Sequence, residues 1–282
     1  MSGLDLNCVV HNSSVVLQHE IAIEIGNVPI LLRTVDENFR DLLASHYAGF
    51  IANPTNPQIE FDVDVAKINE EIPDTDDNDV KVSITDGEWC FRRSDFVARW
   101  DPRQRHGRVR QPATPYSVDA FLRIMHTLIL AQQGGFLLHA ASAVRNGRAF
   151  IFSGVSGAGK TTISRLAPPD VRLLTDEISY IRREGEDYVA CGTPFSGELE
   201  RPGTNCVSPI HSVFLLAKGT ENRIDPLPAS EALRCLLRNI LFFAEDTDLV
   251  NGVFRSAWHF VQKVSVRRLT FLPDDRVWSM IA

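Results

Sequence analysis

The chain has 282 residues, and its 36 acidic and 29 basic side chains give a net charge of −7. That balance argues against a broad nucleic-acid or anionic-membrane surface. The five cysteines show neither metal-ligand spacing nor a disulfide framework. No apolar run approaches the roughly 20 residues of a membrane-spanning helix, and the first residues lack the pattern of a secretory signal. We therefore expect a globular cytoplasmic protein.

The first hundred residues predict mostly β-structure. Val35–Tyr47 has helical spacing, with Asp36 placed to cap its start. The acidic segment 69–79 lacks the glycine and the glutamate that a calcium loop needs, so we expect a solvated loop. Short strands are predicted at Glu20–Ile25, Ile30–Arg33, Gln58–Val65, Val80–Ile84, Glu88–Arg92 and Phe96–Asp101.

Five basic side chains crowd residues 103–110, just before Gln111-Pro112. They predict an exposed hairpin rim, and a docking surface for an acidic substrate segment stays open as the alternative. The next segment, Ser117–Gln132, has a continuous apolar stripe and predicts a helix that Ser117 caps and Gly134 ends.

The remainder of the chain alternates strands and helices. Phe136–Val144 and Arg148–Ser153 form a predicted hairpin, followed by a helix from Thr161 to Leu166. Further strands are expected at Val171–Thr175, Ser179–Arg182, Asp187–Cys191, Val213–Ala217, Val264–Leu272 and Val277–Ile281, with helices at Ala229–Phe243 and Asp246–Val261. This pattern predicts a β-rich domain over residues 1–111, which would position an acceptor, and an α/β domain over residues 112–282.

A phosphate-binding loop lies between the second strand of that hairpin and its helix. Residues 154–161 read Gly-Val-Ser-Gly-Ala-Gly-Lys-Thr, a complete G-x-x-x-x-G-K-T pattern. Glycines let the backbone N–H groups turn towards the phosphates, while Lys160 supplies positive charge and Thr161 a magnesium ligand. The expected nucleotide contacts are Gly154, Val155, Ser156, Gly157, Ala158, Gly159, Lys160, Thr161 and Thr162.

Two acids follow only 15 residues after Thr161, at the end of the next predicted strand. A carboxylate there can accept a proton from an incoming hydroxyl group or hold magnesium. We expect Asp176 to be the general base and Glu177 to be a metal ligand, although the two roles could be exchanged. Close spacing of this kind is typical of small kinases.

Two further positions are candidates for the same site. His139 lies on the strand next to the P-loop strand, where it is either catalytic or an ordinary core residue. The turn-rich segment 192–198 predicts a mobile loop. On or beside it, Glu198 and Glu200 could reach magnesium and Arg201 a phosphate, although a plain surface loop is equally compatible with the sequence.

The ordered set of motifs resembles the C-terminal catalytic domain of HPr kinase/phosphorylase over roughly residues 112–272. The matching parts are Leu138-His139-Ala140-Ala141, the hairpin, the P-loop, and Leu173-Leu174-Thr175-Asp176-Glu177. The resemblance implies an α/β fold with a P-loop core of the HPr kinase and ATP-dependent phosphoenolpyruvate carboxykinase type. It also implies ATP and Mg²⁺ as cofactors, Lys160 and Thr161 on the nucleotide, Asp176 as general base towards a serine hydroxyl, and His139 nearby.

The chain also departs from that enzyme. Its second acid is Glu177 rather than aspartate, and Gly192-Thr193-Pro194-Phe195 replaces the Glu-x-Arg-Gly-x-Gly signature. These departures leave open HPr as the substrate, the phosphorylase direction and the hexameric state. The chain looks more like the divergent HPr-kinase-related group, which includes kinases that phosphorylate a serine of lasso peptides.

The leading functional hypothesis is therefore an ATP-dependent kinase that acts on a hydroxyl group, most simply a serine of a peptide or protein. One alternative is an ATP-binding sensor or scaffold without catalysis. Another is a carboxykinase-like enzyme acting on a small molecule, for which we find no convincing set of ligands in the sequence. The acceptor, the choice between ATP and GTP, and homo-oligomerisation stay open.

Overall fold

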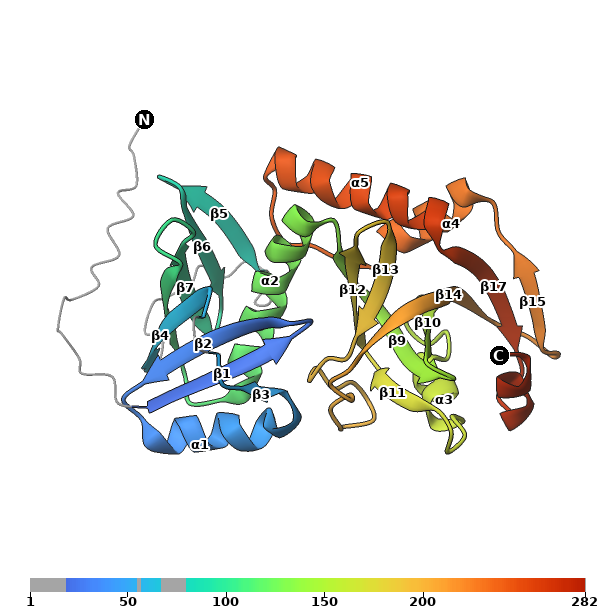
Figure 1. Cartoon of the computed structure of the whole chain (residues 1–282), viewed down its shortest axis with the longest axis horizontal. Helices are drawn as coiled ribbons and strands as arrows, with labels where there is room; N and C mark the ends of the chain where they lie inside the picture. Colours follow the sequence, from blue (N-terminus) through green and yellow to red (C-terminus); the bar gives the residue numbers. More distant parts are fainter. Residues whose placement is uncertain (1–18, 55–56, 67–79, 282) are drawn as a thin grey trace.

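The computed structural model describes residues 19–54, 57–66 and 80–281. It is a mixed α/β structure with two large sheets, one formed by residues before position 112 and the other by residues after position 135. Helix α2 (Pro115–Gln133) runs between the two sheets (Figure 1). The calcium-loop alternative at residues 69–79 lies outside the described residues, as does Cys8.

The first sheet has the strand order β3-β1-β2-β4-β8-β7-β6-β5. The pairs β2–β4 and β4–β8 are parallel, and the other neighbours are antiparallel. Helix α1 (Glu37–His46) follows β2, and the Asp36 carboxylate accepts a hydrogen bond from Phe39 N as predicted. The strands are β1 (His19–Ile25), β2 (Val28–Thr34), β3 (Ile51–Ala52), β4 (Ile59–Val65), β5 (Lys81–Thr85), β6 (Glu88–Arg93), β7 (Phe96–Asp101) and β8 (His106–Gln111), and the 3₁₀ turn η1 (Ala48–Phe50) precedes β3.

The basic stretch lies in a hairpin with exposed arginines, as predicted, but the second strand of that hairpin is not at the rim of the sheet. Residues His106–Gln111 form an inner strand between β4 and β7. Gly107, Val109 and Gln111 are buried, while the arginines between them point outward. The alternation was hidden because glycine and glutamine occupy two of the three buried positions.

The second sheet has the strand order β10-β9-β12-β13-β14-β17-β15. An additional parallel pairing of β10 with β14 closes five of these strands into a ring, and β11 and β16 pair with β9. The strands are β9 (Phe136–Arg145), β10 (Arg148–Ser153), β11 (Arg172–Thr175), β12 (Ile178–Glu184), β13 (Asp187–Cys191), β14 (Val207–Lys218), β15 (Arg223–Pro226), β16 (Ile240–Leu241) and β17 (Ser265–Phe271).

Three predicted elements differ from the structure. Thr114, not Ser117, caps α2, because Pro115 suits the first helical position; the Ser117 hydroxyl instead donates to Asp95. Helix α4 (Ala229–Leu237) ends six residues earlier than predicted, since residues 240–241 join the sheet. The predicted last strand is the 3₁₀ helix η2 (Asp275–Met280), which the Asp274 side chain caps.

The packing joins the two parts of the chain. Helix α5 (Thr247–Lys263) contacts both α2 and α4. One buried cluster contains the first sheet, most of the apolar face of α2, and residues of β12, β13 and α5. Its aromatic centre is Phe121 of α2, whose ring meets Phe61, Phe91 and Phe96 edge-on. Two smaller clusters lie within the second sheet and its helices.

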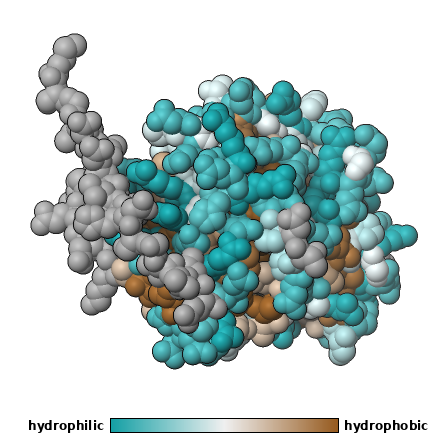
Figure 2. Space-filling view, turned by 60° about the vertical axis from the view of Figure 1, so that its left-hand side comes forward, coloured by the Kyte–Doolittle hydropathy of each residue, from teal (hydrophilic) through white to brown (hydrophobic). Residues whose placement is uncertain are grey.

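Three further observations concern the surface, the helices and the cysteines. Seen from the side of the first sheet, the molecule is mostly hydrophilic, with hydrophobic side chains gathered low on that face (Figure 2). Among the described residues, no helix is long and apolar enough to cross a membrane. The four described cysteines are free thiols.

Candidate active site

The site is built around the loop between β10 and α3 (Lys160–Arg165), at residues 154–159. Gly157 and Gly159 have φ angles of +73° and +110°, a region that side chains disfavour. A Cβ atom at position 159 would also lie 2.6 Å from the ring of Phe271. The strand–loop–helix arrangement predicted for residues 148–165 is therefore present, and the backbone turns as a glycine-rich loop should.

Lys160 is the first residue of α3 and is only 9% exposed. Its Nζ atom donates one hydrogen bond, to the Gly154 carbonyl at 3.1 Å. Burial lowers the pKa of Lys160, and the negative charges of Glu177 and Glu198 partly oppose that shift. A buried ammonium with one neutral acceptor retains donors for an anion.

Asp176 follows the last residue of β11 and is 6% exposed. Its two carboxylate oxygens accept hydrogen bonds from Gly197 N and Leu199 N, both at 2.9 Å. Gly197 fits tightly, since a Cβ there would lie 3.0 Å from Asp176 Oδ2. The carboxylate is thus held in one orientation by backbone groups, with lone pairs left over.

Glu177 faces the cationic side of the site. Its Oε2 atom lies 3.4 Å from Arg123 Nη2 of α2. Burial raises the pKa of Glu177, and the positive charge of Arg123 opposes that shift. Two adjacent acids therefore have different surroundings: Asp176 is bound by amides, and Glu177 is paired loosely with cations.

His139 lies on β9, beside β10 and β12. Its backbone is held by hydrogen bonds with Asn239 and Ser153. Burial lowers the pKa of His139, and the charges of Lys160 and Arg123 lower it further. The imidazole is consequently neutral near pH 7, and the charges of both Lys160 and Arg123 disfavour its protonation.

The segment after β13 is packed rather than exposed. Residues 192–195 are buried, and Thr193 N donates to Leu174 O at 3.1 Å. Gly203 lies so close to the same strand that a Cβ would meet Leu174 O at 1.6 Å. The expectation of a mobile loop rested on its turn-forming residues, but the backbone bonds to β11 hold this segment in place.

The structure brings most predicted site residues together. Electrostatic effects on pKa link Lys160 with Glu177, with Glu198 and with His139. Glu198 and Glu200 are exposed, and Val155 is the most exposed apolar residue of the loop at 73%. Among the described residues, no group of three or more His, Cys, Asp and Glu side chains could hold a metal ion.

Sequence reasoning missed Arg123 as a residue of the site. It comes from the middle of α2, about 50 residues before the acids, and its guanidinium lies 4.8 Å from the centre of the Phe195 ring. A charged residue in a predicted helix gives no local signal. The one available clue was that α2 contains only one other basic side chain, His126.

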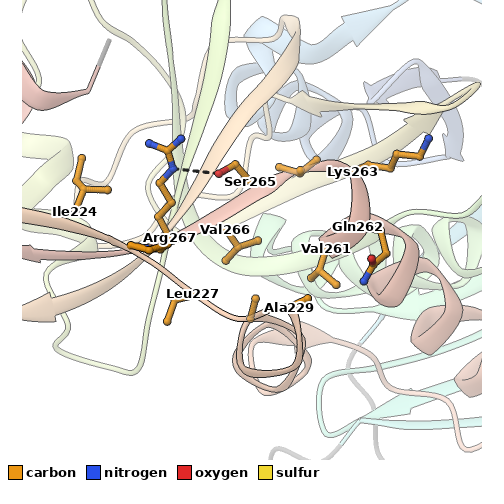
Figure 3. A pocket seen from close by; sticks show the side chains of 12 residues that line it. Ile224, Leu227, Ala229, Val261, Gln262, Lys263, Ser265, Val266 and Arg267 are labelled. Carbon is orange, nitrogen blue, oxygen red and sulfur yellow. Dashed lines mark hydrogen bonds between the residues drawn. The ribbon is translucent and has the colours of Figure 1, made fainter.

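The structure also has two pockets away from the acid pair. A groove of about 490 Å³ runs between β15, β17 and the helices α4 and α5, and Figure 3 shows Arg267 Nε donating to Ser265 at 3.1 Å within it. A second pocket of about 390 Å³ borders α3 and includes Arg201. None of the residues that line the first groove belongs to the predicted site.

The geometry defines an α/β protein with a glycine-rich strand–loop–helix beside an acid pair. Among solved structures, the Hpr(Ser) kinase/phosphatase from Coxiella burnetii is similar over 51% of this chain and 90% of that chain, with 10% sequence identity and a TM-score of 0.29. No curated protein matches the sequence.

A family model matches residues 117–281, which is more than half of the chain. The family is described as SynChlorMet cassette protein ScmC. The chain belongs to this family, and the matched region begins within α2 and contains the loop, the acid pair, His139 and Arg123.

Proposed function

We propose that this protein is an ATP-dependent kinase that transfers the γ-phosphoryl group to a hydroxyl, with a serine of a peptide or protein as the acceptor. The observation that carries the proposal is the buried Lys160, which begins the helix after a complete P-loop and lies in the field of Glu177. A P-loop core is part of the proposal. The first part of the chain, residues 1–111, would position the acceptor.

The loop fits a polyphosphate in its shape and in its donors. Gly157 and Gly159 have positive φ angles, which a loop needs if its backbone N–H groups are to turn towards a phosphate, and Lys160 has one neutral acceptor. Bringing an anion to Lys160 would offset the desolvation that lowers its pKa. The nucleotide contacts would be the residues from Gly154 to Thr162.

The residues present also fit magnesium. This cation is usually held by one or two carboxylates together with phosphate oxygens and water, rather than by a protein cage. The Thr161 hydroxyl and Glu177 would hold it, with Glu198 as a further candidate at the rim. When bound, the metal supplies neutralisation of the phosphate charge.

Asp176 would accept the proton of the acceptor hydroxyl. In the transfer, the acceptor oxygen forms a bond to the γ-phosphorus, the bond from that phosphorus to the β,γ-bridging oxygen breaks, and ADP leaves. The amides of Gly197 and Leu199 fix the Asp176 carboxylate in place for this step. Lys160 balances the charge of the phosphates, and the neutral His139 can donate or accept one hydrogen bond nearby.

The family name offers a practical route to the acceptor. Its members are described as cassette proteins, so peptides and proteins encoded beside the gene are the first acceptors to test. The purified chain would be incubated with ATP, Mg²⁺ and each candidate, and the products examined by mass spectrometry for the addition of one phosphoryl group.

Three outcomes decide the proposal. Phosphorylation that Asp176→Asn removes while ATP still binds would support it. Tight ATP binding with no phosphorylated product from any candidate acceptor would contradict it and favour an ATP-binding sensor or scaffold. Phosphorylation of a small molecule alone would contradict the peptide acceptor and support a carboxykinase-like or other small-molecule enzyme.

A further inference from the structure

Arg123 reaches the site from outside the P-loop region of the chain. It lies near the middle of α2, and its side chain is 25% exposed. Its guanidinium rests against the ring of Phe195, on the same segment whose amides hold Asp176. This contact fixes the plane of the guanidinium at the edge of the site, because arginine stacks well on aromatic faces.

The hydrogen bonding of Arg123 is incomplete. Its Nε atom is buried and has no hydrogen-bond partner among the residues that the structure describes, and the contact of its Nη2 atom with Glu177 is long at 3.4 Å. A paired arginine ordinarily makes two shorter bonds to a carboxylate. Burying a guanidinium donor without a partner costs free energy, so this arrangement is unfavourable unless another anion completes it.

The carboxylates near Arg123 are largely engaged by other groups. The Asp176 carboxylate is bound by two backbone amides. On the other side, Asp119 lies one helical turn away and is held by Tyr47 at 2.6 Å and by His46 at 3.2 Å. Glu177 is acted on by both Arg123 and Lys160, and its contact with Arg123 is long.

We propose that Arg123 is a catalytic residue that binds the phosphoryl group during its transfer, as an arginine supplied by the chain itself. The inference rests on the proposed function. Charge accumulates on the equatorial oxygens and on the leaving oxygen as the bond to ADP breaks, and a planar cation at the edge of the site stabilises that charge. The bonds made and broken are those already described, and Arg123 gains no proton in the step.

The test separates binding of the ground state from binding of the transition state. Arg123→Ala, Arg123→Lys and the wild-type chain would be titrated with a non-hydrolysable ATP analogue and Mg²⁺, and then with fluorescent ADP, Mg²⁺ and aluminium fluoride, which mimics the transferred group. Steady-state hydrolysis of ATP would be measured in parallel. Arg182→Ala is the matched control. Like Arg123, Arg182 is paired with a carboxylate, that of Glu184, and its buried Nε atom has no hydrogen-bond partner among the described residues.

We expect Arg123→Ala to lower the affinity for the aluminium fluoride complex and the kcat by about 10²–10³-fold. Binding of the ATP analogue should change less than about threefold. Added guanidinium ion should restore part of the kcat of Arg123→Ala and should not raise the kcat of the other variants. Arg123→Lys should keep only part of the activity, because lysine cannot form the same planar contact. The Arg182→Ala control should match the wild type.

Three results would overturn the inference. If Arg123→Ala kept wild-type affinity for aluminium fluoride and wild-type kcat, Arg123 would have no catalytic part, while the kinase proposal would stand. If the affinities for both analogues fell equally, Arg123 would bind the ground state or merely position Glu177. If the folded wild-type chain bound neither analogue, the kinase proposal and this inference would fail together.

Discussion

The charged side chains of the two sheets differ in their pairing and burial. In the first sheet, charges meet partners on neighbouring strands: Arg33 pairs with Glu20 and Glu60, Arg110 with Asp64, and His106 with Asp62. In the second sheet, around the P-loop, Lys160, Glu177 and His139 are partly or largely buried, and desolvation is the largest influence on each pKa.

This difference indicates where ligand chemistry belongs. Cross-strand ion pairs at a surface satisfy themselves and contribute modestly to stability and register. Buried groups whose pKa values shift together are unfavourable by themselves and mark a functional site when they gather beside a binding loop. The contrast predicts large functional effects with little loss of stability in one region, and small effects of either kind in the other.

The largest expected effect is that of Lys160→Met. Removing the ammonium should reduce kcat/KM by about 10³-fold or more and abolish measurable nucleotide binding. Because the folded pKa of Lys160 is lowered, the charged amine costs stability below that pKa, and the cost is relieved as pH rises through it. The melting temperature of the variant should therefore equal or exceed that of the wild type at neutral pH. A melting temperature of Lys160→Met below that of the wild type would contradict the idea that the buried charge of Lys160 reduces the stability of the fold.

The acid pair is expected to give the next largest effect. Asp176→Asn should lower kcat by about 10²-fold or more while nucleotide binding persists. Glu177→Gln should also lower activity but should stabilise the apo protein at neutral pH, because a raised carboxyl pKa means that the fold favours the neutral form and loses that stability as pH rises. Thermal denaturation at several pH values checks the second part. Near-normal turnover in Asp176→Asn would show that Asp176 is not the general base.

A third prediction concerns acid sensitivity at His126 of α2, which is buried and has no hydrogen-bond partner for either ring nitrogen within the described part of the chain. Burial lowers the pKa of His126 to about 3. The unfolded chain therefore binds a proton that the folded chain excludes as pH falls from about 6.5 towards 3, and stability decreases by at most about 1.4 kcal/mol per pH unit. His126→Phe should flatten this decrease in urea titrations. An unchanged slope would show that other groups cause the acid loss.

The smallest effect is expected for Arg110→Gln on the outer face of β8. Its pair with Asp64 at 2.7 Å is half exposed, so its loss should cost less than about 1 kcal/mol in free energy of unfolding. Phosphorylation of the acceptor should be unchanged. A rise in KM for the acceptor would instead show that the basic face of the first sheet docks the substrate, and the contrast between the two sheets would need revision.

Much of the local structure could be predicted from the sequence. The helix at residues 37–46 begins where its cap residue predicts, and the hairpin turn at Asn146-Gly147 and the strand before the P-loop are as expected. Apolar periodicity and glycine positions suffice for such elements. Strand β8 escaped this reasoning because its buried face is formed by Gly107, Val109 and Gln111, whose burial depends on the neighbouring strands.

The sequence predicted only those site residues that belong to a local motif. Lys160 and the acid pair are close in sequence, whereas Arg123 and Phe195 meet through the packing of α2 on the second sheet. The amides that bind Asp176 come from residues about 20 positions later. Backbone donors have no side-chain signature, so no sequence pattern could have identified them.

Helix α2 has a practical consequence for anyone who wishes to study the second sheet alone. Its buried face holds Phe121 against three phenylalanine rings of the first sheet, and the same helix carries Arg123. A fragment that starts at residue 112 would expose this apolar face of α2 to water, although it would keep the P-loop motif and the acid pair. Such a fragment should aggregate or need a solubilising fusion, so loss of activity on truncation would not by itself show that residues 1–111 contribute a catalytic group.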